Sequence, residues 1–160
     1  MNKIFILMLL SSLLFSCNNN QIYSKYKSID HNKWHKDSIV SFNVDIKDTL
    51  SNHAIYLNLR NDKDYNFNNI FLIVNVNYPN KNKITDTLEY RMTDEKGRFL
   101  GSGFTDIKEN KLAFKENIIF PLSGKYQFNI QQAVRKNGKE NGIEFLEGIT
   151  DVGLEIEKIK

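Results

Sequence analysis

Apolar and polar residues alternate along most of the chain after Trp34. The clearest runs are residues 40–46, 55–59 and 126–130, in which every second residue is aliphatic or aromatic and those between are mostly polar. A period of two residues is typical of a β-strand with one buried face. These runs therefore predict half-buried strands, and Phe128 is expected between two sheets.

The same pattern, less regular, predicts further strands at residues 70–78, 84–92, 112–118 and 152–156. The first of these is the most apolar, which favours a central position, and Pro79 begins a turn that makes the next its hairpin partner. Residues 105–110 are compatible with one helical turn. About eight strands without a long amphipathic helix predict an all-β fold, namely an antiparallel β-sandwich of the Ig-like or jelly-roll-like kind. A small barrel is the alternative.

The N-terminus has a different pattern, because Ile4 to Leu10 is an unbroken apolar run after Lys3. The run is too short to span a bilayer, which needs about 20 apolar residues, but it suits a secretory signal peptide. Cys17, the only cysteine, follows Ser16, and this arrangement resembles the lipobox of bacterial lipoproteins, although Phe15 departs from that pattern. We expect residues 1–16 to be a lipoprotein signal peptide and Cys17 to be lipidated. A cleaved signal with an incidental cysteine is the alternative.

Residues 17–33 are mostly polar, and their apolar members are scattered without a period. We interpret them as the lipidated cysteine followed by a short polar tether, with the β-sandwich domain at residues 34–160. Alternatively, Tyr23 to Ile29 docks as an irregular first strand. No Asp or Glu occurs between Cys17 and Asp30.

Composition adds bounds on function. Hydrophobic residues make up 41% and charged residues 26% of the 160 residues, as in an ordinary single globular domain. The formal charge of +3 is small and no basic stripe is present, which argues against nucleic acid as a partner.

Three stretches of the mature chain resemble the gliding-motility lipoprotein family GldH of Bacteroidota. They are Leu57 to Asn61 continuing to Tyr65 and Leu72, Asp86 to Leu112, and Phe120 to Gly153, including the segments FNIQQA and LEGITDVG. The resemblance implies an outer-membrane lipoprotein, attached to the membrane by its lipid, that acts with envelope proteins of gliding motility or type 9 secretion. It brings no catalytic motif, so we expect a non-enzymatic protein without a cofactor.

Surface lipoproteins of Bacteroidota resemble one another in an acidic cluster just after the lipidated cysteine. The segment after Cys17 has no carboxylate, so the domain is expected to face the periplasm.

Candidate metal ligands are few. His31 and His35, with Asp30 and Asp37 beside them, could hold zinc if they shared a helix face, but the segment has no apolar helical stripe, so solvated histidines are favoured. Asp62 and Asp64 alternate as in calcium loops but lack the EF-hand spacing, and a turn stabilised by these side chains is favoured. We therefore predict no catalytic, cofactor or metal residues.

A polar segment between two strands is the best candidate for a partner surface. It contains Arg60, Asp62, Asp64, Tyr65 and Phe67, and Arg135 with Lys136 forms a separate basic tip. Exposed aromatics such as Tyr65, Phe67 and Phe99 suit either a protein contact or stacking on sugars. The alternative function is thus a β-sandwich that binds glycan or cell-wall material.

Overall fold

The computed structural model describes residues 20–136, 138 and 141–159, so the predicted signal peptide and Cys17 lie outside the described residues. No helix in the described part is long and apolar enough to cross a bilayer. The elements in chain order are β1 (Gln21–Ser28), the 3-10 turn η2 (Asp30–Asn32), β2 (Lys33–His35), β3 (Val40–Ile46), β4 (His53–Asn61), β5 (Asn69–Asn77), β6 (Lys83–Arg91), β7 (Lys108–Ile118), β8 (Gly124–Gln132), β9 (Phe145–Glu147) and β10 (Ile149–Lys158).

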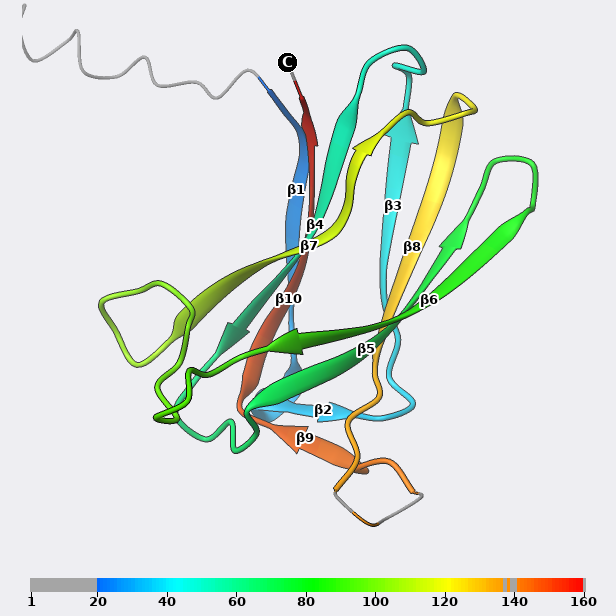
Figure 1. Cartoon of the computed structure of the whole chain (residues 1–160). Coiled ribbons are helices and arrows are strands. Elements are labelled where there is room, and N and C mark those ends of the chain that lie inside the picture. The colour runs from blue at the N-terminus through cyan, green and yellow to red at the C-terminus, as the bar shows by residue number, and fades with distance from the viewer. Residues whose placement is uncertain (1–19, 137, 139–140, 160) are drawn as a thin grey trace, which may run out of the picture.

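The strands form two four-stranded antiparallel sheets and a small ribbon. One sheet has the order β1-β10-β4-β7 and the other the order β3-β8-β5-β6, while β2 pairs with β9. The ribbon lies at one end of the molecule, opposite the β3–β4 and β7–β8 connections (Figure 1). The predicted all-β antiparallel sandwich is confirmed, with ten strands rather than about eight, and the apolar segment 70–78 does form an interior strand, β5.

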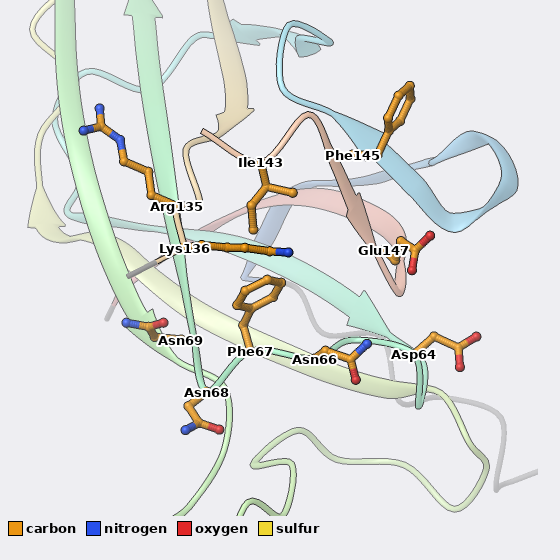
Figure 2. Close-up of a pocket in the computed structure, with 10 residues that line it drawn as sticks. All are labelled: Asp64, Asn66, Phe67, Asn68, Asn69, Arg135, Lys136, Ile143, Phe145 and Glu147. Carbon is orange, nitrogen blue, oxygen red and sulfur yellow. The ribbon is translucent and has the colours of Figure 1, made fainter. Parts of the chain in front are cut away.

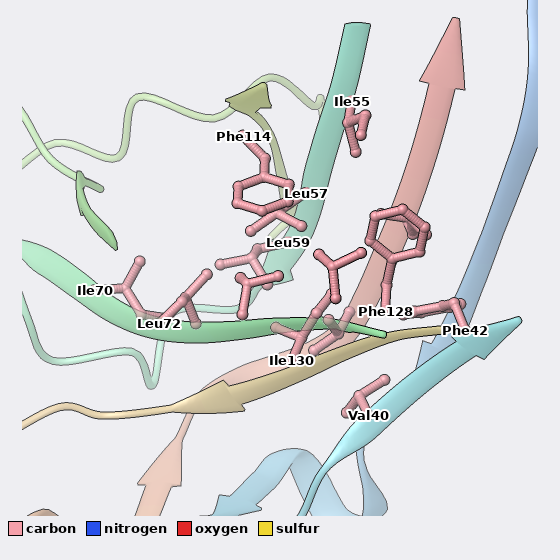
Figure 3. Close-up of a cluster of buried hydrophobic side chains, with 14 of the residues drawn as sticks. Val40, Phe42, Ile55, Leu57, Leu59, Ile70, Leu72, Phe114, Phe128 and Ile130 are labelled. Carbon is pink, nitrogen blue, oxygen red and sulfur yellow. The ribbon is translucent and has the colours of Figure 1, made fainter. Parts of the chain in front are cut away.

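The core lies between the two sheets and is built from the alternating residues. Phe128 on β8 has Phe42 of β3 on one side and Val76 of β5 on the other. In the facing sheet Leu57 stands between Leu154 and Leu112. Side chains from both sheets meet in this layer (Figure 3), and Phe128 has no exposed surface. Removing this apolar surface from water is the main source of stability for such a sandwich.

Two predictions about local structure are wrong. Residues 105–110 do not form a helical turn, because Ser102 and Glu109 exchange backbone hydrogen bonds of 2.9 and 2.8 Å and β7 already begins at Lys108. Residues 21–33 are not a tether, because β1 pairs with β10 along Gln21–Ser28 and η2 and β2 follow it. The docked first strand, which we kept as the alternative, is the correct interpretation.

β1 lacks the alternating pattern because it is an edge strand. Lys25 and Lys27 lie opposite Leu154 and Val152, so they stand on the core side, and the Lys27 ammonium lies 5.7 Å from the centre of the Phe42 ring. Inward-pointing lysines at an edge prevent pairing with another chain. On the outer side, the Tyr26 ring lies against Gly153, where an added Cβ would come within 2.8 Å of the ring. β1 is therefore held by its pairing with β10, by Tyr23 packed against the core on the inner side, and by Tyr26 on the outer side.

Candidate functional site

A polar pocket opens at the end of the sandwich where the β2–β9 ribbon lies. We call it the distal pocket, and it has a volume of about 710 Å³. Figure 2 shows its lining, which comes from the β4–β5 loop, the segment after β8, and β9. The lining residues are Asp64, Asn66, Phe67, Asn68, Asn69, Arg135, Lys136, Ile143, Phe145 and Glu147.

The β4–β5 loop is held in place by Tyr65 and Asp62. Tyr65 is buried, its hydroxyl donates to the Asn69 carbonyl at 2.8 Å, and its ring packs edge-on against Phe67 with centroids 5.9 Å apart. Burial raises the pKa of the Tyr65 hydroxyl, because the phenolate would lose its hydration. The Asp62 carboxylate accepts hydrogen bonds from the Asp64 backbone N–H at 2.9 Å and from the Asn32 side chain at 3.0 Å. The loop therefore presents Asp64 and Phe67 from a fixed base.

Gly148 joins this loop to the opposite wall. Its carbonyl accepts from the Asp62 N–H at 2.9 Å, and its own N–H donates to the Asn32 carbonyl at 2.9 Å. Its φ is +84°, and a Cβ placed there would meet the backbone of Asp64 and Tyr65. Only glycine allows this close approach without strain.

The wall formed by β9 is held by buried residues. Leu146 is fully buried, and the buried Gln132 side chain donates to the Ile143 carbonyl at 2.9 Å and accepts from the Val134 N–H at 3.0 Å. Lys33 forms an ion pair with Glu147 at 2.8 Å, and it holds the pKa of that carboxyl below its ordinary value. The ring of Phe145 stands edge-on to His35 at 4.8 Å.

The distal pocket is lined by acidic, basic and apolar side chains. Figure 2 shows Asp64 and Glu147 on one side, Arg135 on the other, and the Lys136 side chain passing between Ile143 and Phe67. Amide groups of Asn66, Asn68 and Asn69 surround them. The described lining has no His, Cys, Ser or Thr, so it does not contain a Ser–His or Cys–His pair of the kind used in nucleophilic catalysis. This arrangement suits binding through hydrogen bonds, ion pairs and aromatic contact.

The structure divides the five predicted partner-surface residues. Asp64 and Phe67 line the distal pocket, whereas Asp62 is used within the loop and Tyr65 is buried. The interpretation of Tyr65 as an exposed aromatic is wrong, since only 3% of it is exposed, and Phe67 and Phe99 are half-buried.

Arg60 lies elsewhere, on the outer face of the sheet that contains β4. It pairs with Glu109 at 3.0 Å and stacks on the Tyr26 ring at 4.1 Å, while the Tyr26 hydroxyl donates to the same carboxylate at 2.6 Å. These contacts fix β1 across β10 and β4. Arg60 is thus a structural residue and not part of the pocket.

Sequence reasoning missed the other half of the pocket. The sequence predicts Arg135 and Lys136 as a basic tip separate from the loop, and it gives no signal for a site at Ile143, Phe145 and Glu147. β9 has three residues, too few for an alternating pattern to be recognised. Its position follows from pairing with β2, which the sequence did not reveal either.

The candidate metal ligands have other roles. His31 is exposed with φ of 54° in η2 and His35 is on β2, so they do not share a helix face. The Asp62 turn forms as expected. Among the residues that the structure describes, no group of three His, Cys, Asp or Glu side chains could hold a metal ion.

One similar solved structure is distant in sequence. The chain is similar to the VP2 protein of an infectious bursal disease virus subviral particle, with a TM-score of 0.37 and 14% identity over 86% of this chain and 30% of that one. A likeness at this level supports no inference about fold or function.

Sequence relatives are far closer. The chain is 48% identical over 153 residues to the gliding motility lipoprotein GldH of Flavobacterium johnsoniae, covering 96% of this chain and 94% of that protein. It is also 48% identical over 156 residues to a GldH homolog of Christiangramia forsetii, covering 98% and 95%. Residues 21–156 match the model of the GldH lipoprotein family, and this range begins at β1 and ends in β10. The chain therefore belongs to the GldH lipoprotein family.

Proposed function

We propose that this protein is anchored in the outer membrane by lipid on Cys17 and serves gliding motility or type 9 secretion as a non-enzymatic accessory protein. The observation that carries the proposal is the distal pocket, which we assign as the contact site for an envelope protein. The names of the two relatives support the process and the lipid anchor. The composition of the pocket supports a binding role.

Protein interfaces are enriched in aromatic residues and arginine, with polar groups around them. The distal pocket has this composition, because Phe67 and Ile143 lie among charged and amide groups and Phe145 stands at the edge of the pocket. Phe145 is 50% exposed, with His35 against one side of its ring, while Tyr65 fixes the Phe67 ring in advance. A rigid apolar centre with both signs of charge beside it favours one docking orientation.

The domain is proposed to face the periplasm. The support is the absence of a carboxylate between Cys17 and Asp30, where surface-exposed lipoproteins of these bacteria resemble one another in having an acidic cluster. In this orientation the distal pocket meets periplasmic subunits.

A photo-crosslinking residue in place of Lys136 tests the partner site. In cells it should crosslink to one or a few envelope proteins, because Lys136 is exposed and lines the pocket. The matched control carries the same crosslinking residue at Thr87. This residue is exposed on β6, on the outer face of the β3-β8-β5-β6 sheet, and should give little crosslinked product. Adding Arg135→Glu to the Lys136 probe should reduce the yield.

Equal crosslinking at both positions would contradict the assignment of the pocket. Retention of the purified protein on glycan or cell-wall material, with no protein crosslinked at Lys136, would instead favour the glycan-binding alternative. Phe67 and Phe145 would then act as stacking platforms.

Cys17→Ser tests the anchor. Cells fed a clickable fatty acid should label the wild-type protein and not the variant, since the thiol is the proposed attachment point, and the variant should leave the lipid-bound fraction with its signal peptide uncleaved. Equal labelling of the wild-type protein and Cys17→Ser would contradict the lipid anchor.

Protease added to intact cells tests the orientation. It should spare the wild-type protein and digest it only after the outer membrane is opened. Digestion in intact cells would place the domain on the outside of the cell.

A further inference from the structure

The end of the sandwich opposite the distal pocket is where the N-terminal segment leaves the fold. The backbone N–H of Lys158 donates to the Asn20 carbonyl at 2.7 Å, and that of Ile159 donates to the Asn52 carbonyl at 2.8 Å. Lys158 also pairs with Asp48 at 3.0 Å. The start of β1, the end of β10 and the β3–β4 loop are thus joined, and Figure 1 shows the β7–β8 connection at the same end.

We call this region the anchor end. It comprises residues 20–21, 47–52, 78–83, 119–124 and 158–159. The β5–β6 turn belongs to it because Pro79 lies beside Gly124, where an added Cβ would be 3.2 Å from the proline ring.

Only two residues, Asn18 and Asn19, lie between Cys17 and Asn20, so the two positions are three residue steps apart. Even a fully extended chain spans at most about 3.3–3.6 Å per residue, so Asn20 lies within about 11 Å of the cysteine. The inference that follows rests on the proposed lipidation of Cys17. Given that anchor, the chain has too little length to hold the anchor end clear of the lipid headgroups.

Apolar side chains project from the loops of the anchor end. Leu50 is 88% exposed at the tip of the β3–β4 loop, and Ile119 is 53% exposed after β7. The loop that carries Leu50 is a fixed turn, since the Asp48 carboxylate accepts from the backbone N–H groups of Leu50 and Ser51 at 3.0 Å each. A leucine held in solvent by a rigid turn has no function within the fold. It is suited to insertion into an apolar phase.

The charge of the anchor end is also suited to a lipid surface. The region contains four lysines, Lys47, Lys81, Lys83 and Lys158, and one carboxylate, Asp48, which gives a net charge of +3. All four lysines are exposed. Basic residues beside a bilayer are attracted to anionic headgroups.

We propose that the anchor end is a membrane-contacting surface of the protein. Leu50 and Ile119 enter the headgroup region of the leaflet that holds the lipid anchor, and the lysines bind its anionic phosphates. This contact gives the domain a fixed orientation on the membrane. The distal pocket, at the opposite end of the sandwich, then points away from the membrane toward soluble or membrane-spanning partners.

Fluorescence quenching in vesicles tests the contact. Leu50→Cys in the lipidated full chain carries the only free thiol, which is labelled with an environment-sensitive dye. The protein is reconstituted into vesicles of phosphatidylethanolamine and phosphatidylglycerol that contain a lipid with a shallow quencher. We expect most of the fluorescence to be lost and the emission to shift to the blue.

Phe104→Cys is the matched control, because Phe104 is a fully exposed apolar residue in the β6–β7 loop, outside the anchor end. Its dye should keep the fluorescence it has in buffer. Unquenched dye at Leu50 in protein that floats with the vesicles would overturn the contact and leave the lipid anchor standing. Equal quenching at both positions would also overturn it. Protein that does not float would overturn the anchor and the contact together.

Discussion

Phe128→Ala should lower the free energy of unfolding by about 3–5 kcal/mol, which is the usual cost of removing a buried phenylalanine and leaving a cavity. Phe128 has no exposed surface and lies in register with Phe42 on one neighbouring strand and Val76 on the other. The loss is large against a typical total stability of about 5–15 kcal/mol. Urea denaturation of the purified domain measures it from the shift in midpoint.

Gln127→Ala is the matched control on the same strand. Gln127 faces outward, and its side-chain oxygen accepts hydrogen bonds from Asn77 at 2.9 Å and Asn129 at 3.3 Å. These are partly exposed bonds between neutral groups, so the cost should stay near or below about 1 kcal/mol. Comparable losses for the two variants would show that the register of β8 is not the one described.

Strands buried on one face were predictable because apolar residues alternate with polar ones along them, and this alternation follows which side faces the core. β3 alternates along its whole length and β8 alternates from Tyr126 to Ile130, and the inward residues of both runs are all buried. β1 could not be predicted from alternation, because an edge strand need not bury all of its core-side residues. Lys25 and Lys27 occupy core-side positions in it. β2 and β9 could not be predicted because each has three residues, too few for an alternating pattern to be recognised.

The candidate site was half predictable for a related reason. Asp64 and Phe67 belong to a polar loop that is visible in the sequence, but the same loop contains Tyr65, which is buried because it packs into the core beside the distant Gly148. Arg60 looked like a surface charge, and its pairing with Glu109 depends on the alignment of β4 with β7. Phe145 and Glu147 stand beside the loop because β9 pairs with β2 and the adjoining Gly148 accepts a hydrogen bond from Asp62. Such distant pairings leave no local signal.

Gly148→Ala should be among the most damaging small substitutions, because two penalties act at one position. The φ of +84° is unfavourable for alanine by about 1–2 kcal/mol. The new methyl group would also lie 2.6 Å from the carbonyl carbon of Asp64, a backbone atom that cannot rotate away. Overpacking of this kind adds about 1–3 kcal/mol, so we expect a total of about 2–5 kcal/mol in urea denaturation.

Gly97→Ala separates the two penalties. Gly97 has φ of +76°, but no atom lies within 4 Å of its added Cβ, so only the conformational cost of about 1–2 kcal/mol applies. The excess loss at Gly148 then measures how tightly the β9–β10 junction is packed against the β4–β5 loop. Relief of the clash requires that loop to move, which breaks the hydrogen bonds from the Asp62 N–H to Gly148 and from the Asn32 side chain to the Asp62 carboxylate. Crosslinking at Lys136 should therefore fall in Gly148→Ala even where the protein remains folded, and it should persist in Gly97→Ala. Equal stability of the two variants would mean that the junction yields easily and that the distal pocket is not preformed.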